Sequence, residues 1–235
     1  MNGNENILTA EHLVKSYRGS HRAVDDCSFV IPRGHIVGLL GPNGCGKTTT
    51  IKMINGLLRP DEGEILIDGE KPGIATHAMV SYMPDRTFLD LDMKISSAIA
   101  FYADVFGDFN CGKAKEMRSE LGLEEDAKLK ELSKGMLEKL QLLLVMSRDA
   151  QLYVLDEPIG GVDPAARESI LHSILNNSAE NAAILISTHL IAEVENILDD
   201  VILMHSGHVV LQEPAEQLRA EKGKSVNSYF KEVFA

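Results

Sequence analysis

The sequence predicts an α/β fold in which an antiparallel β portion precedes a parallel sheet and a helical insertion interrupts it. A glycine-rich loop at 41–49 lies between the apolar run 35–40 and the helix-like segment 50–54. The continuous apolar run 151–155 is typical of a strand buried within a parallel sheet. Between residues 88 and 150, strand-like runs disappear and helical periodicity replaces them.

The first part of the chain is predicted to consist mainly of strands. Residues 7–31 have the composition of strands, with a turn at 18–20. A strand at 64–67 follows a strong turn signal, and a short strand at 78–82 ends before Pro84. The parallel strand that leads into the glycine-rich loop lies between these segments.

Three segments of helical periodicity form the insertion: 95–106, 113–121 and 134–147. Mixed charges over 113–139 are most simply their solvent-exposed faces. We expect one domain of 235 residues. Residues 1–87 and 151–235 would form its α/β core with the N-terminal β portion, and residues 88–150 its helical subdomain.

The α/β alternation resumes after the insertion. Asp163 is a plausible N-cap and Pro164 a favourable first residue for a helix at 164–176. The remaining elements are expected as a strand at 182–187, a helix at 191–198, a hairpin of 201–204 and 208–211, a short helix at 214–221 and a tail at 222–235.

Composition restricts the class of protein. The 23 Lys and Arg against 35 Asp and Glu give a net charge of −12, which argues against a nucleic-acid binder. Cys27, Cys45 and Cys111 are scattered and read as reduced thiols of a cytosolic protein. The polar start lacks a secretory signal, and the apolar runs are too short to cross a bilayer. A membrane role would therefore need a partner chain.

The loop at 41–49 fits G-x-x-x-x-G-K-[ST] in the strand–loop–helix context that this motif requires. Its backbone amides and the positive end of the following helix favour phosphate binding. Lys47 would reach the β- and γ-phosphates, and the Thr48 hydroxyl would bind Mg²⁺. The residues expected to contact the nucleotide are Gly41, Pro42, Asn43, Gly44, Cys45, Gly46, Lys47, Thr48 and Thr49.

Two carboxylates follow the apolar strand at 152–155. Asp156, at the strand tip beside the phosphate loop, is placed to hold Mg²⁺. Glu157 would face the γ-phosphate and orient the attacking water as a general base. An acidic pair at a strand end is also common surface chemistry, but the phosphate loop upstream favours the catalytic interpretation.

Further motifs resemble those of the nucleotide-binding subunit of ATP-binding-cassette (ABC) transporters, over nearly the whole chain. Residues 132–136, LSKGM, occupy the place of the LSGGQ signature at a helix start. Residues 160–163 are similar to the D-loop, residues 186–189 to the segment that ends in the switch histidine, and Tyr17 to the aromatic residue that stacks on adenine. The resemblance implies a P-loop NTPase (RecA-like) core.

It also implies an ATPase that works as a head-to-tail dimer. Each ATP would lie between one phosphate loop and the signature of a second nucleotide-binding domain. The Ser133 hydroxyl and the Gly135 N–H would bind the γ-phosphate across the interface, and Asp163 would link the two sites. His189 would contact the γ-phosphate within its own subunit. Catalysis would then rest on Glu157, His189 and Lys47, with ATP and Mg²⁺ bound.

Simpler readings remain open at several positions. Tyr17 could be a packed core residue, and His189 a satisfied polar residue at a strand end. Ser133 could act only as an N-cap, a role compatible with phosphate binding. His205 and His208 flank a hairpin turn, where a structural role is favoured over a metal site.

The chain departs from the family pattern at three positions. Asp85 replaces the usual glutamine after Tyr82-Met83-Pro84, and we hypothesise that it senses Mg²⁺. Lys134 replaces the first signature glycine, where it could add positive charge near the γ-phosphate or lie solvated. Met136 removes an amide from the signature.

Cys45, among the loop amides near Lys47, is either a thiol of lowered pKa or an inert small side chain.

LSKGM, combined with Pro84-Asp85-Arg86, resembles ATPases of small bacterial ABC-2-type exporters linked to GntR-type regulators, including exporters of antimicrobial or cytotoxic peptides. The resemblance implies transmembrane permease partners, no nucleic acid, and a cytoplasmic protein peripheral on the inner face of the membrane. The alternatives are a soluble ABC ATPase without a membrane partner and a binding-only regulatory subunit. Candidates for the groove that receives the permease are Phe88, Leu89, Phe101, Tyr102 and Phe106, although ordinary core positions are the favoured explanation for most of them.

Overall fold

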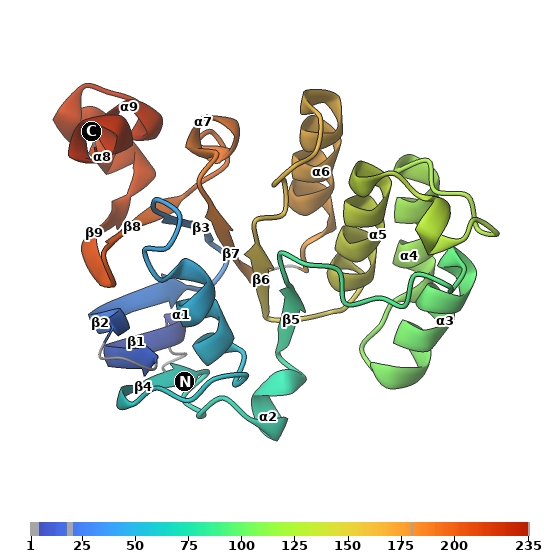
Figure 1. Ribbon diagram of the computed structural model, residues 1–235, viewed down its shortest axis with the longest axis horizontal. Coiled ribbons are helices and arrows are strands. Elements are labelled where there is room, and N and C mark those ends of the chain that lie inside the picture. The colour runs from blue at the N-terminus through green and yellow to red at the C-terminus, as the bar shows by residue number, and fades with distance from the viewer. Residues whose placement is uncertain (1–4, 18–20, 180, 235) are drawn as a thin grey trace.

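The computed structural model describes residues 5–17, 21–179 and 181–234, which form two sheets and the helices around them (Figure 1). The smaller sheet is antiparallel, in the order β2-β1-β4. Its strands are β1 (Asn6–Tyr17), β2 (His21–Pro32) and β4 (Glu62–Ile67). The predicted turn at 18–20 lies outside the described residues.

The larger sheet has the order β5-β6-β7-β3-β8-β9 and is parallel except for the β8–β9 hairpin. Its strands are β3 (Ile36–Leu40), β5 (Val80–Met83), β6 (Leu152–Asp156), β7 (Ala183–Thr188), β8 (Asp200–His205) and β9 (His208–Pro214). Because β3, β6 and β7 are adjacent and parallel, the loops at their carboxyl ends meet at one edge of the sheet, the usual place for a ligand site in such sheets.

The helices complete the fold. They are α1 (Lys47–Ile54), α2 (Ile74–His77), α3 (Ile95–Val105), α4 (Cys111–Glu120), a 3₁₀ turn η1 (Leu129–Glu131), α5 (Lys134–Met146), α6 (Pro164–Asn177), α7 (Ile191–Val194), α8 (Ala215–Lys222) and α9 (Val226–Val233). Among the described residues, no helix is both long enough and apolar enough to span a membrane.

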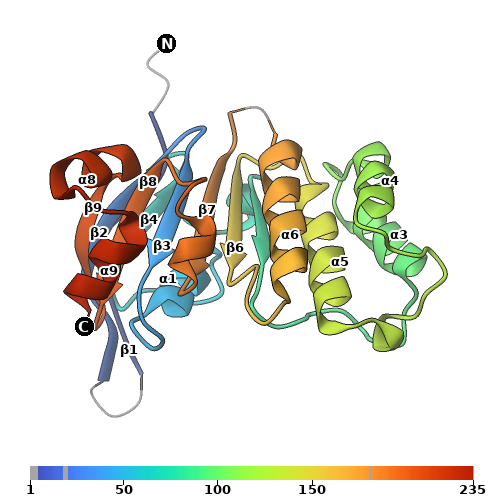
Figure 2. The same ribbon diagram turned by 90° about the horizontal axis from the view of Figure 1, so that it is seen from above.

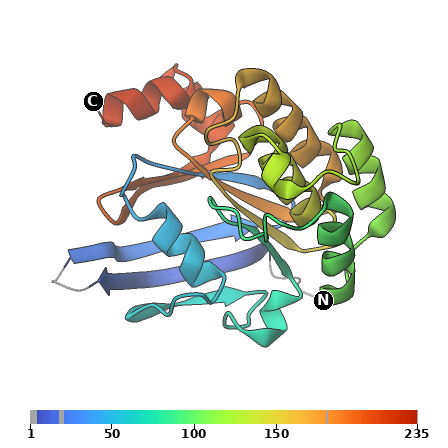
Figure 3. The same cartoon turned by 45° about the vertical axis from the view of Figure 1, so that its right-hand side comes forward.

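Alternation along the central strands divides the core in two. Leu152 and Val154 of β6 pack with α1 and the small sheet, so α1 lies between the two sheets (Figure 3). Tyr153 and Leu155 point to the opposite face, which α5, α6 and the C-terminal helices cover (Figure 2). Between β5 and β6 the chain forms the helices α3, α4 and α5, which lie at the right of Figure 1.

The predicted α/β fold class is confirmed, but two local expectations were wrong and one helix was missed. The tail at 222–235 contains α9, which begins where the Ser225 hydroxyl accepts from the Ser228 N–H and Val226 becomes fully buried. The short helix α2 was not predicted. The helix expected at 191–198 ends after Val194, because the chain then turns to bury Leu198 beneath Gly38 before entering β8.

Candidate functional site

The phosphate loop connects β3 to α1 and is held by close backbone packing. A Cβ on Gly41 would lie 2.5 Å from both the Cys45 Sγ and the Met204 carbonyl oxygen. Gly46 has φ of 113°, and a Cβ there would overlap the carbonyl oxygen of Ala23. Only glycine fits these two positions, so the loop's curvature follows directly from its sequence.

Lys47 lies folded across the mouth of this loop. Its side chain is 6% exposed, and its Nζ donates to the carbonyl oxygens of Gly41 and Pro42 at 2.7 and 3.3 Å. The same atom is 3.9 Å from the Glu157 Oε1. The loop therefore presents its cation toward the carboxylate that follows β6, one strand away from β3 in the sheet.

Asp156 is almost fully buried at the tip of β6. Its Oδ1 accepts from the Ser187 hydroxyl at 2.5 Å and from the Thr48 hydroxyl at 3.4 Å. Its Oδ2 is buried without a hydrogen-bond partner among the described residues. Burial raises the pKa of Asp156, and the charges of Asp85 and Glu157 raise it further. A carboxylate with a free oxygen beside a hydroxyl suits a hard cation such as Mg²⁺, which prefers oxygen ligands.

Glu157 and His189 contact each other directly. The His189 Nδ1 lies 3.0 Å from both carboxylate oxygens of Glu157, and the Thr188 hydroxyl donates to Oε2 at 3.1 Å. Glu157 has φ of 53°, the left-handed region that a residue with a side chain seldom adopts. Such backbone strain is typical of functional sites. The arrangement fixes a carboxylate at the sheet edge next to Lys47.

The structure thus brings together five predicted residues: Lys47, Thr48, Asp156, Glu157 and His189. We name these five the catalytic cluster. It draws on the loops after β3, β6 and β7, as the sheet order requires.

Three other predicted residues form a separate group where α5 and α6 begin. The Ser133 hydroxyl accepts from the Met136 N–H at 3.3 Å, and the Asp163 Oδ1 accepts from the Ala166 N–H at 3.0 Å. A Cβ on Gly135 would lie 3.4 Å from the Val162 Cγ1, so the two helix starts pack closely. We name Ser133, Gly135 and Asp163 the signature group. No hydrogen bond among the described residues joins it to the catalytic cluster.

Tyr17 and Asp85 lie at the edges of the site. Tyr17 is 46% exposed, with its hydroxyl 3.4 Å from the Thr49 Oγ1, so the packed-core interpretation is wrong. Its ring stands next to the phosphate loop. Asp85 is exposed after β5, close enough for its charge to raise the pKa of the Asp156 carboxyl.

The hypothesis of a reactive thiol at Cys45 is contradicted. Cys45 is 3% exposed, and burial raises its pKa. Lys47 and the backbone amides oppose the shift but do not overcome it. The Cys45 Sγ lies against Gly41 in the packed base of the loop, so the cost of burying a charged thiolate there outweighs the help of the nearby amides.

The hairpin histidines have structural partners. The His205 ring packs on Phe234 with the ring centres 5.1 Å apart, and the His208 Nε2 lies 3.8 Å from the Asp25 Oδ2. In the part of the chain that the structure describes, no group of three or more His, Cys, Asp or Glu residues is arranged around a common metal position.

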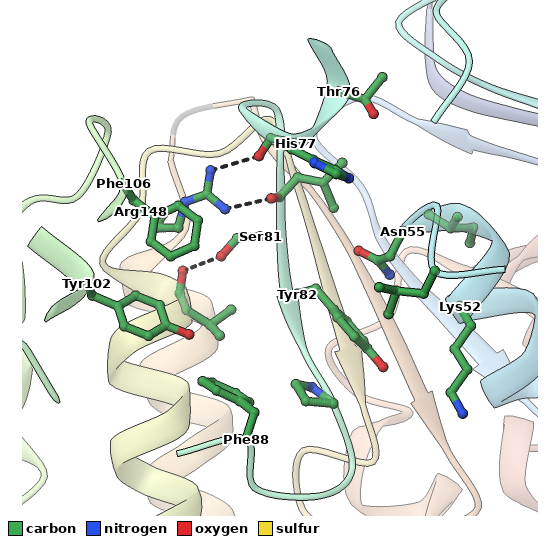
Figure 4. Close-up of a pocket in the computed structure, with 15 residues that line it drawn as sticks. Lys52, Asn55, Thr76, His77, Ser81, Tyr82, Phe88, Tyr102, Phe106 and Arg148 are labelled. Carbon is green, nitrogen blue, oxygen red and sulfur yellow. Dashed lines mark hydrogen bonds between the residues drawn. The ribbon is translucent and has the colours of Figure 1, made fainter. Parts of the chain in front are cut away.

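A cavity of about 530 Å³ lies between α1, β5 and the insertion helices (Figure 4). Of the five groove candidates, Phe88, Tyr102 and Phe106 line it, whereas Leu89 and Phe101 do not.

Sequence analysis missed Arg148, a buried residue of the same cavity. Its guanidinium donates to the carbonyl oxygens of His77 and Val80 and to Asp108, and lies 4.2 Å from the centre of the Phe106 ring. Arg148 therefore joins β5 to the insertion. The available signal was a cation two residues after the end of the apolar run 142–146.

Comparison with known proteins covers most of the chain. The family model described as "ABC transporter" matches residues 24–160. The chain is 34% identical over 232 residues to the SkfA peptide export ATP-binding protein SkfE of Bacillus subtilis (strain 168), covering 94% of this chain and 95% of the relative. It is 35% identical over 233 residues to the Nod factor export ATP-binding protein I of Ralstonia nicotianae, covering 95% and 72%. A solved structure, "Structure of ATP binding subunit of ABC transporter", matches with a TM-score of 0.85 at 28% identity, covering 97% of this chain and 100% of that one.

Proposed function

This chain belongs to the ABC transporter family and is an ATP-binding subunit of such a transporter, and from this premise we propose that it hydrolyses ATP to power export through a separate permease. The observation that carries the proposal is the catalytic cluster. A buried carboxylate with a free oxygen lies beside the Thr48 hydroxyl, and a second carboxylate lies between Lys47 and His189.

Each member of the catalytic cluster has a proposed role. Lys47 would turn from the loop carbonyls to the β- and γ-phosphates of ATP. Thr48 and Asp156, with Asp85 at the rim, would hold Mg²⁺, which neutralises phosphate charge when bound. Glu157 would accept the proton of the attacking water, and His189 would hold that carboxylate and contact the γ-phosphate. Tyr17 would stack on the adenine.

The signature group would complete the site of a second copy or of a related nucleotide-binding domain. Ser133 and Gly135 lie at the start of α5, where the helix dipole favours a phosphate. Among the described residues, no hydrogen bond or ion pair joins them to the catalytic cluster of their own subunit. We therefore propose a head-to-tail dimer with each ATP between one phosphate loop and the other subunit's signature, and with Asp163 linking the two sites.

We propose that a segment of the permease binds in the cavity of Figure 4. Its wall is mainly apolar and aromatic. Lys52 and Arg148 are the charged side chains among the residues that line it, and Arg148 is paired with Asp108 behind the wall. In a chain of net charge −12 this apolar wall with Lys52 at its edge is suited to an apolar segment that carries an acidic residue. Residues 88–150 would then move as one helical unit in response to ATP.

The direction of transport is inferred from relatives. Their printed names describe export of a peptide, SkfA, and of Nod factor. Together with the LSKGM signature, they support an exporter, and the peptide relative covered over nearly its full length supports a peptide substrate. We place the chain at the inner face of the membrane, bound to its permease, and expect a GntR-type regulator to be encoded beside it.

Co-purification with the multi-span membrane protein encoded nearby tests this function. The wild-type chain should be retained in detergent by that permease, and peptide should stimulate ATP hydrolysis by the complex. Tyr102→Glu, which places a carboxylate in the cavity, should lose the permease. Phe101→Glu, exposed on the same helix but not lining the cavity, is the matched control. Full ATPase activity with no permease binding would favour a soluble ATPase, and binding without hydrolysis a regulatory subunit.

The role of Asp85 has its own test. If this carboxylate senses Mg²⁺, Asp85→Ala should raise the Mg²⁺ concentration needed for half-maximal hydrolysis and lower turnover. Unchanged values for both would remove Asp85 from the metal site.

A further inference from the structure

Lys134 and Glu138 form an ion pair that local helix stability does not explain. The Lys134 Nζ lies 3.7 Å from the Glu138 Oε1, one turn along α5. Lys134 is the first residue of the helix, where the dipole disfavours a cation, and an i,i+4 pair with the lysine first is the weaker order. The pair therefore calls for another explanation.

The burial of the Glu138 carboxylate destabilises the folded chain. Its side chain is 10% exposed, and its Oε2 is buried with no hydrogen-bond partner in the described part of the chain. Burial raises the pKa of Glu138 to about 7, and Lys134 is the cation that opposes this shift. The Glu138 carboxylate thus pairs with Lys134, but one of its own oxygens is left without a hydrogen bond.

The same ammonium also contacts the D-loop. Gly161 has φ of 84°, and a Cβ there would overlap the Lys134 Nζ. One residue earlier, the Gly160 N–H donates to the carbonyl oxygen of Glu157 at 2.9 Å. Lys134 therefore rests on a short segment that begins at the proposed general base.

Lys134 can leave this position. Its side chain is 67% exposed and stands on a flexible stem between Ser133 and Gly135, the residues proposed to bind the second subunit's ATP. A γ-phosphate arriving there carries more charge than the single carboxylate that holds Lys134 in the isolated subunit.

We propose that Lys134 is a shared cation, bound to Glu138 over the D-loop in the isolated subunit and transferred to the γ-phosphate of the second subunit's ATP on dimerisation. This rests on the proposed head-to-tail dimer. The exchange breaks one ion pair and forms another, with no covalent change. Because it lifts the ammonium from Gly161, it frees the segment that begins at Glu157. ATP bound in one site is thereby reported to the base of the other.

The test measures dimerisation of the full chain in a Glu157→Gln background with Mg²⁺ and increasing ATP, by analytical ultracentrifugation. Lys134→Gln should raise the ATP concentration for half-maximal dimer by about ten-fold or more, the effect of losing one charged contact. Binding of a fluorescent ATP analogue to the monomer should not change, because Lys134 acts on the other subunit's nucleotide. Lys139→Gln, the same charge change on the same helix, should have no effect.

The sign of the Glu138→Gln effect separates this exchange from a structural role. Removing the competing carboxylate should lower the ATP concentration needed for the dimer, and the double variant should behave like Lys134→Gln alone. Lys134→Arg, which keeps the charge, should restore most of the dimer.

The outcomes separate this proposal from the dimer itself. If the Glu157→Gln parent forms no ATP-dependent dimer, the head-to-tail site is wrong and the exchange falls with it. If the parent dimerises but Lys134→Gln matches Lys139→Gln, or if Glu138→Gln weakens the dimer, only the cation exchange is overturned.

Discussion

The catalytic cluster and the signature group are two halves of one proposed site, but they are built differently. In the cluster, Lys47 and Asp156 are buried. The Glu157 carboxylate accepts a hydrogen bond from the Thr188 hydroxyl, contacts the His189 ring and lies close to the Lys47 ammonium. In the signature group, Ser133 is exposed, and its hydrogen bonds within the described part of the chain go to the start of its own helix. One half is organised before ATP binds, whereas the other presents unused donors to solvent.

This difference predicts a division of labour. A preorganised cluster can stabilise charge as it develops, which is where most catalytic power arises. An exposed helix start gains a strong partner only when a phosphate arrives. Changes in the cluster should therefore reduce chemistry, and changes in the signature group should reduce assembly.

The largest effect is expected for Glu157→Gln. Loss of a general base lowers turnover by about 10²- to 10⁴-fold. The amide keeps the shape and a hydrogen bond to His189, so ATP affinity of the monomer should stay near wild type. Steady-state ATPase rates and equilibrium ATP binding check this. Normal turnover would show that Glu157 is not the general base, and the assignment of chemistry to the catalytic cluster would be wrong.

Mixing two inactive variants tests whether the halves come from different subunits. Lys47→Ala should abolish phosphate binding at its own loop but leave its signature intact. Gly135→Asp adds a carboxylate where the γ-phosphate would lie, and its Cβ has room beside Val162. Each alone should be nearly inactive, but a mixture should regain part of the wild-type rate, since half of the sites in a mixed dimer combine two intact halves.

No recovery in the mixture, with both proteins folded by circular dichroism, would place both halves in one subunit. Glu157→Gln mixed with Lys47→Ala is the matched control. Both changes lie in the catalytic cluster, so every mixed site keeps one defective loop and activity should stay low.

The two halves also differ in how far the sequence could predict them. The cluster follows from strand–loop–helix patterns, because parallel strands bring their carboxyl ends to one edge whatever the rest of the chain does. Sequence analysis could not predict that Lys47 folds onto Gly41, that Lys134 rests on Gly161, or that Arg148 joins β5 to the insertion. These contacts depend on side-chain directions between distant segments, which periodicity does not encode. Cys45 failed for the same reason: its place in the motif suggested exposure to amides, but packing buried it.

Glu138 gives a smaller effect, on stability. Its folded-state pKa of about 7 lies above the ordinary value of 4.5. Between these values the folded chain binds more protons than the unfolded chain, so stability falls as pH rises through this window and levels off above it. Glu138→Gln has no such ionisation and should be more stable than wild type at pH 8 by up to about 3 kcal/mol, and equal to it near pH 4.5. Urea unfolding at several pH values checks this, and a gain independent of pH would show that the carboxylate is not the cause.

The smallest effect is expected at Cys45, the phosphate-loop thiol that the sequence suggested could be reactive. Cys45 and Cys27 are buried, and burial raises the pKa of Cys27 to about 11, whereas Cys111 is exposed at the start of α4. Since the thiolate is the reactive form, N-ethylmaleimide should modify Cys111 first, as followed by peptide mass spectrometry. ATPase activity at one label per chain should then be unchanged, and Cys111→Ser should make the chain resistant. Labelling of Cys45 first, slowed by ATP, would instead mean that the loop opens enough to expose its base, and that the catalytic cluster is less preorganised than its hydrogen bonds indicate.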